Sequence, residues 1–311
     1  MRTATTDPDD ELTIEEWTRR HTGSRTVQTL IETVARNVFT ANANEVPAAL
    51  FFTNVREGAA YNHFGFAPRG NIEIAERIAA AIVEHGGEVR TGWEVSRIEI
   101  EDGLAVAIRA TAPDGQEVRL EASAVVSNAG PTKTAEMVLG TPVEEAFRER
   151  VADVLPTSML ALSLSTTEDF LADCPGMLNF TDTDRLCSIA NLTALCPELA
   201  PEGRTLYDAF SVAAVGGRRI RRGRRAGPPG GRPAQDAALV RQGRGRPLQG
   251  DARRQPRAAL RPSNNPSVAT PVPNMVDVGD GVRPGALIGT SACAMTAAEA
   301  VELLERASVG A

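Results

Sequence analysis

The sequence is poor in aromatic residues and contains no long apolar run. Aromatic residues make up 4% of the 311 residues, so the core must be built from Ala, Val, Leu and Ile. No run approaches the roughly 18 apolar residues that a membrane-spanning helix needs. The first residues, MRTATTDPDDELTIEEW, hold no apolar stretch of the kind found in a secretory signal. These absences predict a cytoplasmic globular protein.

Disulfides and metal sites have little support in the sequence. None of the four cysteines belongs to a C-x-x-C pair, and His21, His63 and His85 lie far from them in the chain. This spacing matches neither a disulfide framework nor a zinc site. We therefore expect a reducing compartment and no metal.

Lysine is nearly absent, since Lys133 is the only one among 33 basic residues. Most arginine codons are GC-rich and lysine codons are not, so the gene is expected to be GC-rich. Arginine is also unevenly placed. Residues 217–262 hold fourteen arginines against two acids, a net charge of +12, while the remaining 19 basic and 38 acidic residues give −19.

Three interpretations of residues 217–262 compete. The segment has the charge of an RGG-like nucleic-acid binder but no aromatic residue on which a base could stack. A disordered insertion fits its Arg, Gly and Pro content, which cannot bury enough apolar surface to fold. A frame-shifted stretch of a GC-rich gene would have the same composition, and we favour this interpretation. All three predict low order.

Helical periodicity dominates the first third of the chain. Residues 10–45 carry apolar side chains at spacings of three and four, and Thr13 with Glu16 predicts a capping box. Residues 71–86 form a strong helical pattern with Asn71 as its expected N-cap and one apolar face containing Ile74, Ile78 and Ile82.

The apolar period then changes to two. Strands are expected at 95–100, 104–110 and 118–120, separated by Asp-Gly turns at 102–103 and 114–115. Asp-Gly between alternating apolar runs is a strong hairpin signal. The stretch AVVSN that follows is typical of a short buried strand.

The pattern becomes helical again over 132–152. Residues 158–166 and 205–213 are candidate strands of a second layer. Helices alternating with strands and a meander predict an α/β fold with mixed sheets.

The order of these blocks resembles the phytoene desaturase-like FAD-dependent oxidoreductases of the flavin amine oxidase superfamily. Three blocks carry the resemblance, namely FAPRGNIEIAERIAAAIVEHGGEVRTGWEVSRIEIEDGLAVAI, ASAVVSNAGP and NMVDVGDGVRPGALIGTSACAMTAAEAVELL. The resemblance implies part of an FAD-binding Rossmann-like domain with a β-meander and part of a substrate-binding domain. It divides the chain into a helical part of the substrate domain at 1–66, an FAD-domain portion at 67–140, a substrate-domain portion at 141–216, the Arg-rich segment at 217–262 and a flavin-binding strand, loop and helix at 263–311.

The resemblance also implies which residues bind FAD. The Asp of the GDG motif, which contacts the ribityl or pyrophosphate part, falls on Asp280. The N–H groups near Val282 would face the flavin pyrimidine oxygen, and the backbone of Val95 would meet the adenine. The complete set of implied cofactor-binding residues is Val95, Gly279, Asp280, Gly281, Val282, Arg283, Ile288, Gly289 and Thr290. A plain strand, turn and helix, with Asp280 as a turn residue or cap, is the alternative.

One element of the family pattern is missing. The family begins with a strand, G-x-G-x-x-G and a helix that holds the cofactor pyrophosphate. The 311 residues contain no G-x-G-x-x-G. We therefore expect a chain that is truncated at its N-terminus relative to the family and binds FAD weakly.

The family transfers hydride from a C–C bond, or in some members a C–N bond, to the flavin. His63 is a candidate proton-transfer residue, although a packed or exposed histidine is the commoner case. Tyr61, Phe64 and Phe66 could line an apolar substrate channel or serve only as packing, and Asp208 is a further polar candidate. An apolar substrate implies contact with a membrane surface. The alternatives are a non-catalytic remnant, nucleic-acid binding through 217–262, and a flavin amine oxidase, which an aromatic cage would favour.

Overall fold

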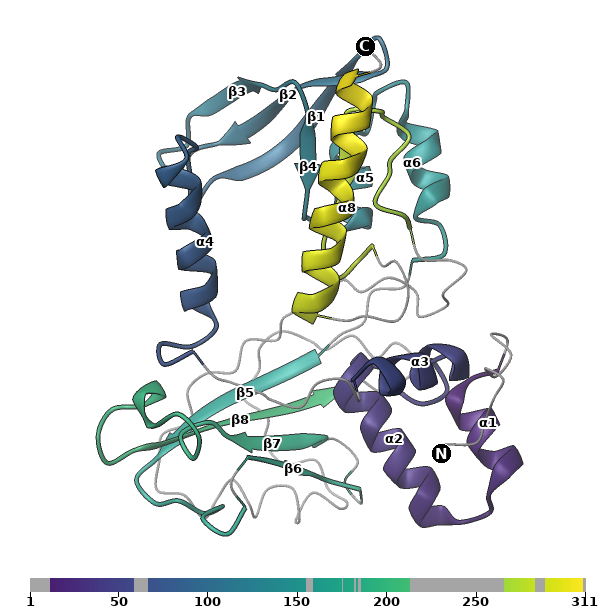
Figure 1. Ribbon diagram of the computed structural model, residues 1–311, viewed down its shortest axis with the longest axis vertical. Coiled ribbons are helices and arrows are strands. Elements are labelled where there is room, and N and C mark those ends of the chain that lie inside the picture. Colours follow the sequence, from purple (N-terminus) through teal and green to yellow (C-terminus); the bar gives the residue numbers. More distant parts are fainter. Residues whose placement is uncertain are drawn as a thin grey trace.

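The computed structural model describes most of the chain apart from its ends and a long internal stretch. The described residues are 12–58, 67–154, 159–174, 176–181, 183, 186–212, 266–282 and 289–309. The Arg-rich segment 217–262 lies outside them, so the expectation of low order there stays a prediction. In Figure 1 the described elements gather into an upper and a lower part.

Three helices and a four-stranded sheet make up the lower part. The helices are α1 (Ile14–His21), α2 (Arg25–Phe39) and α3 (Ala48–Gly58). The predicted capping box begins α1, since Glu16 N donates to Thr13 Oγ1 and the Glu16 carboxylate accepts from Thr13 N. The three helices enclose a core around Phe39, Leu50 and Phe51.

The lower sheet has the order β5-β8-β7-β6, and its paired strands run antiparallel. Its strands are β5 (Met159–Thr166), β6 (Met177–Asn179), β7 (Ser188–Asn191) and β8 (Thr205–Val212), with the short helix η1 (Pro197–Leu199) between the last two. β5 and β8 confirm the two strands expected at 158–166 and 205–213. Thr33 and Asn37 on α2 hydrogen-bond to β6 and the residue after it, which joins the helices to the sheet.

Tyr207 is the largest side chain fully buried in the lower sheet. Its hydroxyl donates to Asp169 Oδ1 at 2.5 Å and its ring stacks on Phe170 at 4.1 Å between centroids. Burial, together with the Asp169 carboxylate, raises the pKa of Tyr207 to about 12. The hydroxyl therefore stays protonated and holds the loop after β5.

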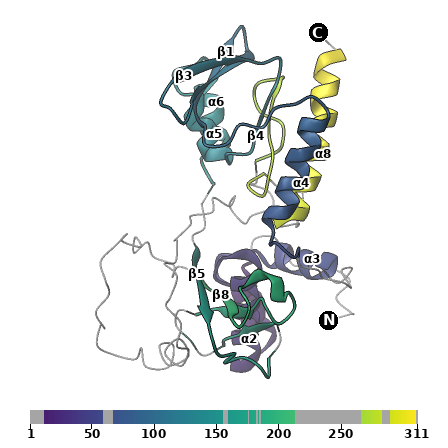
Figure 2. The same cartoon turned by 90° about the vertical axis from the view of Figure 1, so that its left-hand side faces the viewer.

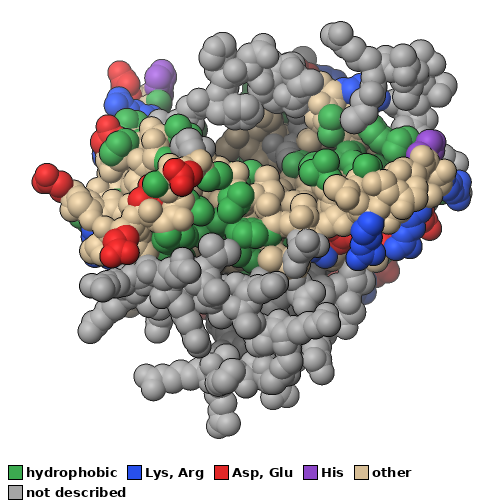
Figure 3. All heavy atoms as spheres, turned by 90° about the horizontal axis from the view of Figure 1, so that it is seen from below, with side chains coloured by type: hydrophobic (Ala, Val, Ile, Leu, Met, Phe, Trp, Pro, Cys, Tyr) green, Lys and Arg blue, Asp and Glu red, His purple; other side chains and the backbone are tan. Residues whose placement is uncertain are grey.

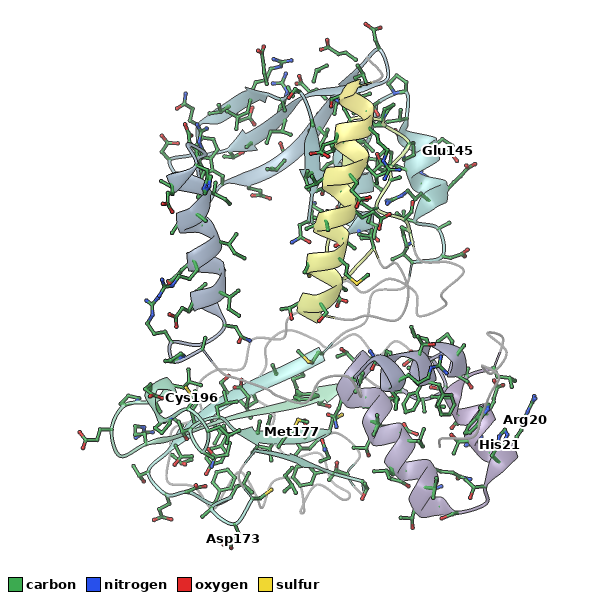
Figure 4. All side chains as sticks on the ribbon, viewed as in Figure 1. Arg20, His21, Glu145, Asp173, Met177 and Cys196 are labelled. Atoms are coloured by element: carbon green, nitrogen blue, oxygen red, sulfur yellow. The ribbon has the colours of Figure 1, made fainter. Side chains whose placement is uncertain are left out.

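The outer surface of the lower part is mixed in character. Seen from below, Figure 3 shows hydrophobic side chains across the middle of this face and basic side chains toward the end where α1 and α2 lie. Figure 4 shows Arg20 and His21 at the outer side of α1, and Asp173, Met177 and Cys196 on the sheet side of the lower part. His21 stacks on Trp17 and its Nδ1 lies 2.8 Å from Trp17 O, so both of these contacts are made within α1.

The upper part contains the predicted meander and a separate parallel strand pair. The meander strands are β1 (Glu94–Glu101), β2 (Leu104–Thr111) and β3 (Glu117–Glu121), which pair antiparallel in that order. Positive φ angles at Asp102, Gly103 and Gly115 confirm the two Asp-Gly turns. The strand β4 (Val125–Ser127) pairs in parallel with β9 (Met275–Asp277).

Helices lie on both sides of this parallel pair. Figure 2 shows α4 (Ile72–Glu84) and α8 (Gly289–Val309) on one side of β4. The other side holds α5 (Pro131–Met137), α6 (Glu144–Arg150) and the meander. The upper part is thus a layer of helices, a parallel pair and a second layer containing the meander.

Two details differ from the sequence-based expectations. Asn71 makes no side-chain cap at α4, because its backbone is already helical. The helix expected at 132–152 is two helices, α5 and α6. Phe147 of α6 packs in one buried cluster with Ile98 and Met275. The predicted division of the chain into domains stays a prediction.

Candidate functional site

The candidate site lies where β4 and β9 end. The two strands are in register, with Val126 opposite Val276 and Ser127 opposite Asp277. Because they are parallel, their carboxyl ends lie at one edge of the pair, and each runs through a glycine-containing turn into a helix. Ligands of open α/β sheets bind outside the carboxyl ends of the strands. This edge is therefore a candidate ligand site.

The two turns at this edge are packed so closely that glycine is required in one of them. A Cβ atom on Gly279 would lie 2.1 Å from Asn128 Oδ1, and its φ is +101°. A Cβ atom on Gly281 would lie 2.8 Å from Cδ of Pro131, the first residue of α5. A side chain at either position would make a contact below 3.0 Å, which would force neighbouring atoms to move. Glycine at both positions therefore lets the turn after β9 pack against the turn after β4.

The turn after β9 contains Gly279, Asp280, Gly281 and Val282, and we call it the glycine turn. Asp280 connects this turn to α8. Its Oδ1 accepts a hydrogen bond from Gly289 N at 3.0 Å. A carboxylate at the first turn of a helix is stabilised by the unpaired N–H groups and the dipole there. Asp280 therefore acts as a cap in this structure, which is the alternative that the sequence left open, and the contact does not by itself test its predicted role toward FAD.

Thr296 anchors the same turn from the middle of α8. Its side chain is fully buried, and its Oγ1 accepts from Gly279 N at 2.9 Å while donating to Ala292 O. Val282 N donates to Gly279 O at 3.2 Å. The N–H groups of Gly279, Val282 and Gly289 are thus used inside the chain, and the flavin contact expected near Val282 stays a prediction.

A buried ion pair includes Asp277, the last residue of β9. Arg150 Nη1 lies 2.5 Å from Asp277 Oδ2, and their side chains are 11% and 1% exposed. Arg150 Nη2 also donates to Ser267 O. Burial raises the pKa of Asp277, and this effect outweighs the lowering by the Arg150 guanidinium. The pair joins the end of α6 to the strand that leads into the glycine turn.

Ser127 and Thr134 form a second polar contact beneath the edge. Their hydroxyl oxygens are 2.7 Å apart, and Thr134 Oγ1 also lies 3.0 Å from Gly130 O. Both side chains are buried. This contact links the end of β4 to the first turn of α5.

The structure brings together part of the predicted set. Gly279, Asp280, Gly281 and Val282 form the turn, and Gly289 and Thr290 begin α8. Val95 is half-buried in β1 and packs against the cluster that contains Ile98 and Met275. Val95 is therefore a core residue, and the predicted backbone contact with adenine stays a prediction.

Asp208 lies elsewhere, since it accepts from the Ser163 hydroxyl in the lower sheet, away from the turns. The predicted residues outside the described part are Tyr61, His63, Phe64, Phe66, Arg283 and Ile288.

Several residues of the site were not predicted. Asn128 and Pro131 lie within the quoted block ASAVVSNAGP, so their proximity to the glycine turn could have been inferred from two strands ending at one edge. Thr296 and Arg150 carry no comparable signal, because a threonine in a helix and an arginine on a charged helix are ordinary. Among the residues that the structure describes, no group of three or more His, Cys, Asp and Glu side chains could hold a metal ion.

Comparison with protein families identifies the class. The model of the flavin containing amine oxidoreductases matches residues 2–225, so the chain belongs to this family. Its cofactor is FAD, as the flavin-containing family indicates. No curated protein matches the chain. None of the described helices is long and apolar enough to cross a membrane.

Solved structures confirm the expected fold class. An oxidoreductase from Methanosarcina mazei is 21% identical with a TM-score of 0.76, and the match covers 97% of this chain and 69% of that chain. The PF1083 protein from Pyrococcus furiosus is 18% identical with a TM-score of 0.71, covering 96% and 69%. A putrescine oxidase with a redesigned cofactor site is 13% identical with a TM-score of 0.62, covering 96% and 68%.

Proposed function

We propose that the chain is an FAD-dependent oxidoreductase in which hydride passes from a C–C bond of an apolar substrate to the flavin. The observation that carries this proposal is the pair of interlocked turns at the carboxyl ends of β4 and β9, formed by Gly279 and Gly281 against Asn128 and Pro131. Bound FAD supplies the hydride-accepting chemistry, while the protein supplies binding, orientation and electrostatics. An apolar substrate partitions into lipid, so we also propose contact with a membrane surface.

The residues of the edge would hold one half of the cofactor. Gly279 and Gly281 let backbone approach the ligand without side-chain atoms between them. Asp280 is an acceptor and carries negative charge, so it suits a ribityl hydroxyl and would repel a phosphate. Its bond to Gly289 N fixes the direction of the carboxylate before any ligand arrives.

We further propose that FAD affinity is weakened in this 311-residue chain. The sequence has no G-x-G-x-x-G to bind the pyrophosphate. Hydrogen bonds to charged groups contribute about 1.5–3 kcal/mol each. Losing three of them would weaken binding more than about a thousandfold, at about 1.4 kcal/mol per factor of ten.

A titration with FAD tests this proposal. The purified chain should carry little flavin, and added FAD should bind saturably with quenching of its fluorescence. Asp280→Ala should weaken that binding about tenfold, because it removes one hydrogen bond from a charged acceptor. Glu145→Ala is the matched control, since Glu145 points outward from α6 in Figure 4. Stoichiometric flavin after purification would contradict the weakened affinity. An absence of saturable binding would contradict an FAD half-site, meaning that the turns after β4 and β9 hold one half of the cofactor.

Hydride transfer from the C–N bond of an amine is a second candidate. It is favoured by the description of the family and by the names of two structural neighbours, putrescine oxidase and cyclohexylamine oxidase. The aromatic pairs of the described residues lie in the lower part, around Trp17 and Tyr207, and none flanks the glycine turn. Anaerobic bleaching of the bound flavin by an apolar polyene or by an amine separates the two candidates.

A further inference from the structure

Gly279 lies where the chain leaves β9 and enters the glycine turn. A 2.8 Å bond from Val278 N to Ser127 O continues the pairing with β4 just past β9. At the next residue the backbone turns away from the sheet, with a φ of +101° at Gly279. The N–H of Gly279 donates to the Thr296 hydroxyl at 2.9 Å. This hydroxyl therefore supplies the acceptor at the point where the strand ladder ends.

The Thr296 hydroxyl has a defined orientation because its single proton is already used. Its Oγ1 lies 2.9 Å from Ala292 O and 3.1 Å from Cys293 O, and a helical threonine donates to such carbonyls of its preceding turn. The lone pairs of Oγ1 are then left to face Gly279 N. Thr296 is fully buried, so the bond to Gly279 N is a directed contact shielded from water.

Thr18 shows the same local bond without the second role. It is a buried threonine of α1, and its Oγ1 donates to Ile14 O at 2.7 Å, again four residues back. Among the residues that the structure describes, no backbone N–H donates to the Thr18 hydroxyl. The acceptor role of Thr296 is therefore separate from the tendency of helical threonines to bond their own helix.

Two hydrogen bonds attach the glycine turn to α8 at well separated points. Asp280 Oδ1 accepts from Gly289 N at the first residue of the helix, and Gly279 N donates to Thr296 farther along it. At about 1.5 Å of rise per residue, the two helical residues are about 10 Å apart along the axis. Two bonds at this separation define the tilt of the turn as well as its position.

Apolar packing holds the same elements together but does not orient them. Val276 of β9, Val282 of the glycine turn and Ala300 of α8 belong to one buried cluster. Hydrophobic contacts are non-directional. They keep the turn against α8 without selecting the direction of the Gly279 N–H, so the orientation of the turn depends on the hydrogen bonds.

We propose that Thr296 is a positioning residue of the FAD half-site, whose hydroxyl holds Gly279 N and thereby sets the direction of the Asp280 carboxylate before FAD binds. Thr296 acts only through Gly279, the residue that precedes Asp280. Groups that are ordered before the ligand arrives bind it more tightly, because binding no longer has to order them. This inference rests on the proposed function for the identity of the ligand, and its effect on the turn requires no ligand.

Thr296→Val tests this role, because valine keeps the branched shape of threonine and removes the hydroxyl. In the chain without FAD, NMR should show at least about tenfold faster exchange of the Gly279 amide, while the Val278 amide exchanges as in the wild type. FAD affinity, measured by fluorescence titration, should fall at least about tenfold. Thr296→Ser keeps the hydroxyl, so both values should return to within about threefold of the wild type.

Thr18→Val is the matched control, since it removes the corresponding helical bond from another buried threonine. It should change neither the exchange of the Gly279 amide nor the FAD affinity. If Thr296→Val fails to fold, as judged by circular dichroism, Thr296→Ala takes its place, because alanine is smaller and introduces no clash.

The proposal is overturned if removing the hydroxyl changes the Gly279 exchange or the FAD affinity no more than Thr18→Val does. It is also overturned if Thr296→Ser is as impaired as Thr296→Val, since the shape of the side chain would then matter and not its hydroxyl. Faster Gly279 exchange in Thr296→Val, together with no saturable FAD binding by the wild-type chain, would instead contradict the proposed function and leave Thr296 as the residue that orients the turn.

Discussion

Replacing Arg150 with methionine is expected to lower the free energy of unfolding by about 3–5 kcal/mol, the usual cost of removing one partner of a buried ion pair. Asp277 is 1% exposed, so its carboxylate would be left in the interior without a counter-charge. The bond from Arg150 to Ser267 O would be lost as well. Urea unfolding followed by far-UV circular dichroism measures the change.

The deficit of this variant should depend on pH. Burial raises the pKa of Asp277 above its unfolded value, so the folded state binds the proton more tightly. A raised carboxyl pKa favours folding at low pH, and this contribution is lost as pH rises through the folded pKa. Without Arg150 the pKa should rise further. The difference between variant and wild type should therefore be smaller at acid pH than at neutral pH.

A double variant provides the control for charge. Arg150→Met with Asp277→Leu removes both members of the pair, and it should recover a large part of the lost stability because no buried charge remains. An exposed pair offers a second comparison, since Arg306→Met on α8 breaks a bond between side chains that are both 70% exposed. That variant should change stability by less than about 1 kcal/mol. Equal effects of Arg150→Met and Arg306→Met would contradict the account.

Gly281→Val is expected to lower FAD affinity at least about tenfold, equivalent to about 1.4 kcal/mol. The new side chain would meet Cδ of Pro131, and a Cβ atom alone would lie 2.8 Å from it. Pro131 is buried at the first position of α5, so the turn must move instead of the proline. Overpacking of this kind costs about 1–3 kcal/mol of stability. Fluorescence titration with FAD and thermal unfolding measure the two effects.

Gly23→Val is the matched control for this substitution. A Cβ atom at Gly23 has no atom within 4 Å, and Gly23 precedes α2 in the lower part. The control should leave FAD affinity unchanged and thermal stability nearly so. If Gly281→Val kept the affinity of the wild type while remaining folded, the glycine turn would not approach the cofactor.

Much of the fold could be predicted because the relevant signals are local. Thr13 and Glu16 form the expected capping box, and the positive φ angles of Asp102 and Gly103 form the expected turn. Both depend on residues within three positions of each other. The apolar stripe of α4 was also predicted, but its exposure was not, because burial depends on a neighbouring layer that the described chain does not supply.

The candidate site could be predicted only where it is contiguous in sequence. The turn from Gly279 to Val282 and the start of α8 follow one motif. The contacts that hold the turn come from distant segments, since Arg150 and Asp277 are separated by 127 positions and Asn128 meets Gly279 across two strands. Nothing in the local pattern of an arginine on a charged helix indicates a buried partner so far along the chain.

Hydrogen exchange with and without saturating FAD tests the central claim most directly, because it reports where on the chain the cofactor binds. The account predicts slower exchange at Gly279–Val282 and in the turn at 128–131, with no change in the lower sheet around Tyr207. Protection confined to the lower part, or no protection at either turn under saturating FAD, would contradict an FAD half-site at the carboxyl ends of β4 and β9.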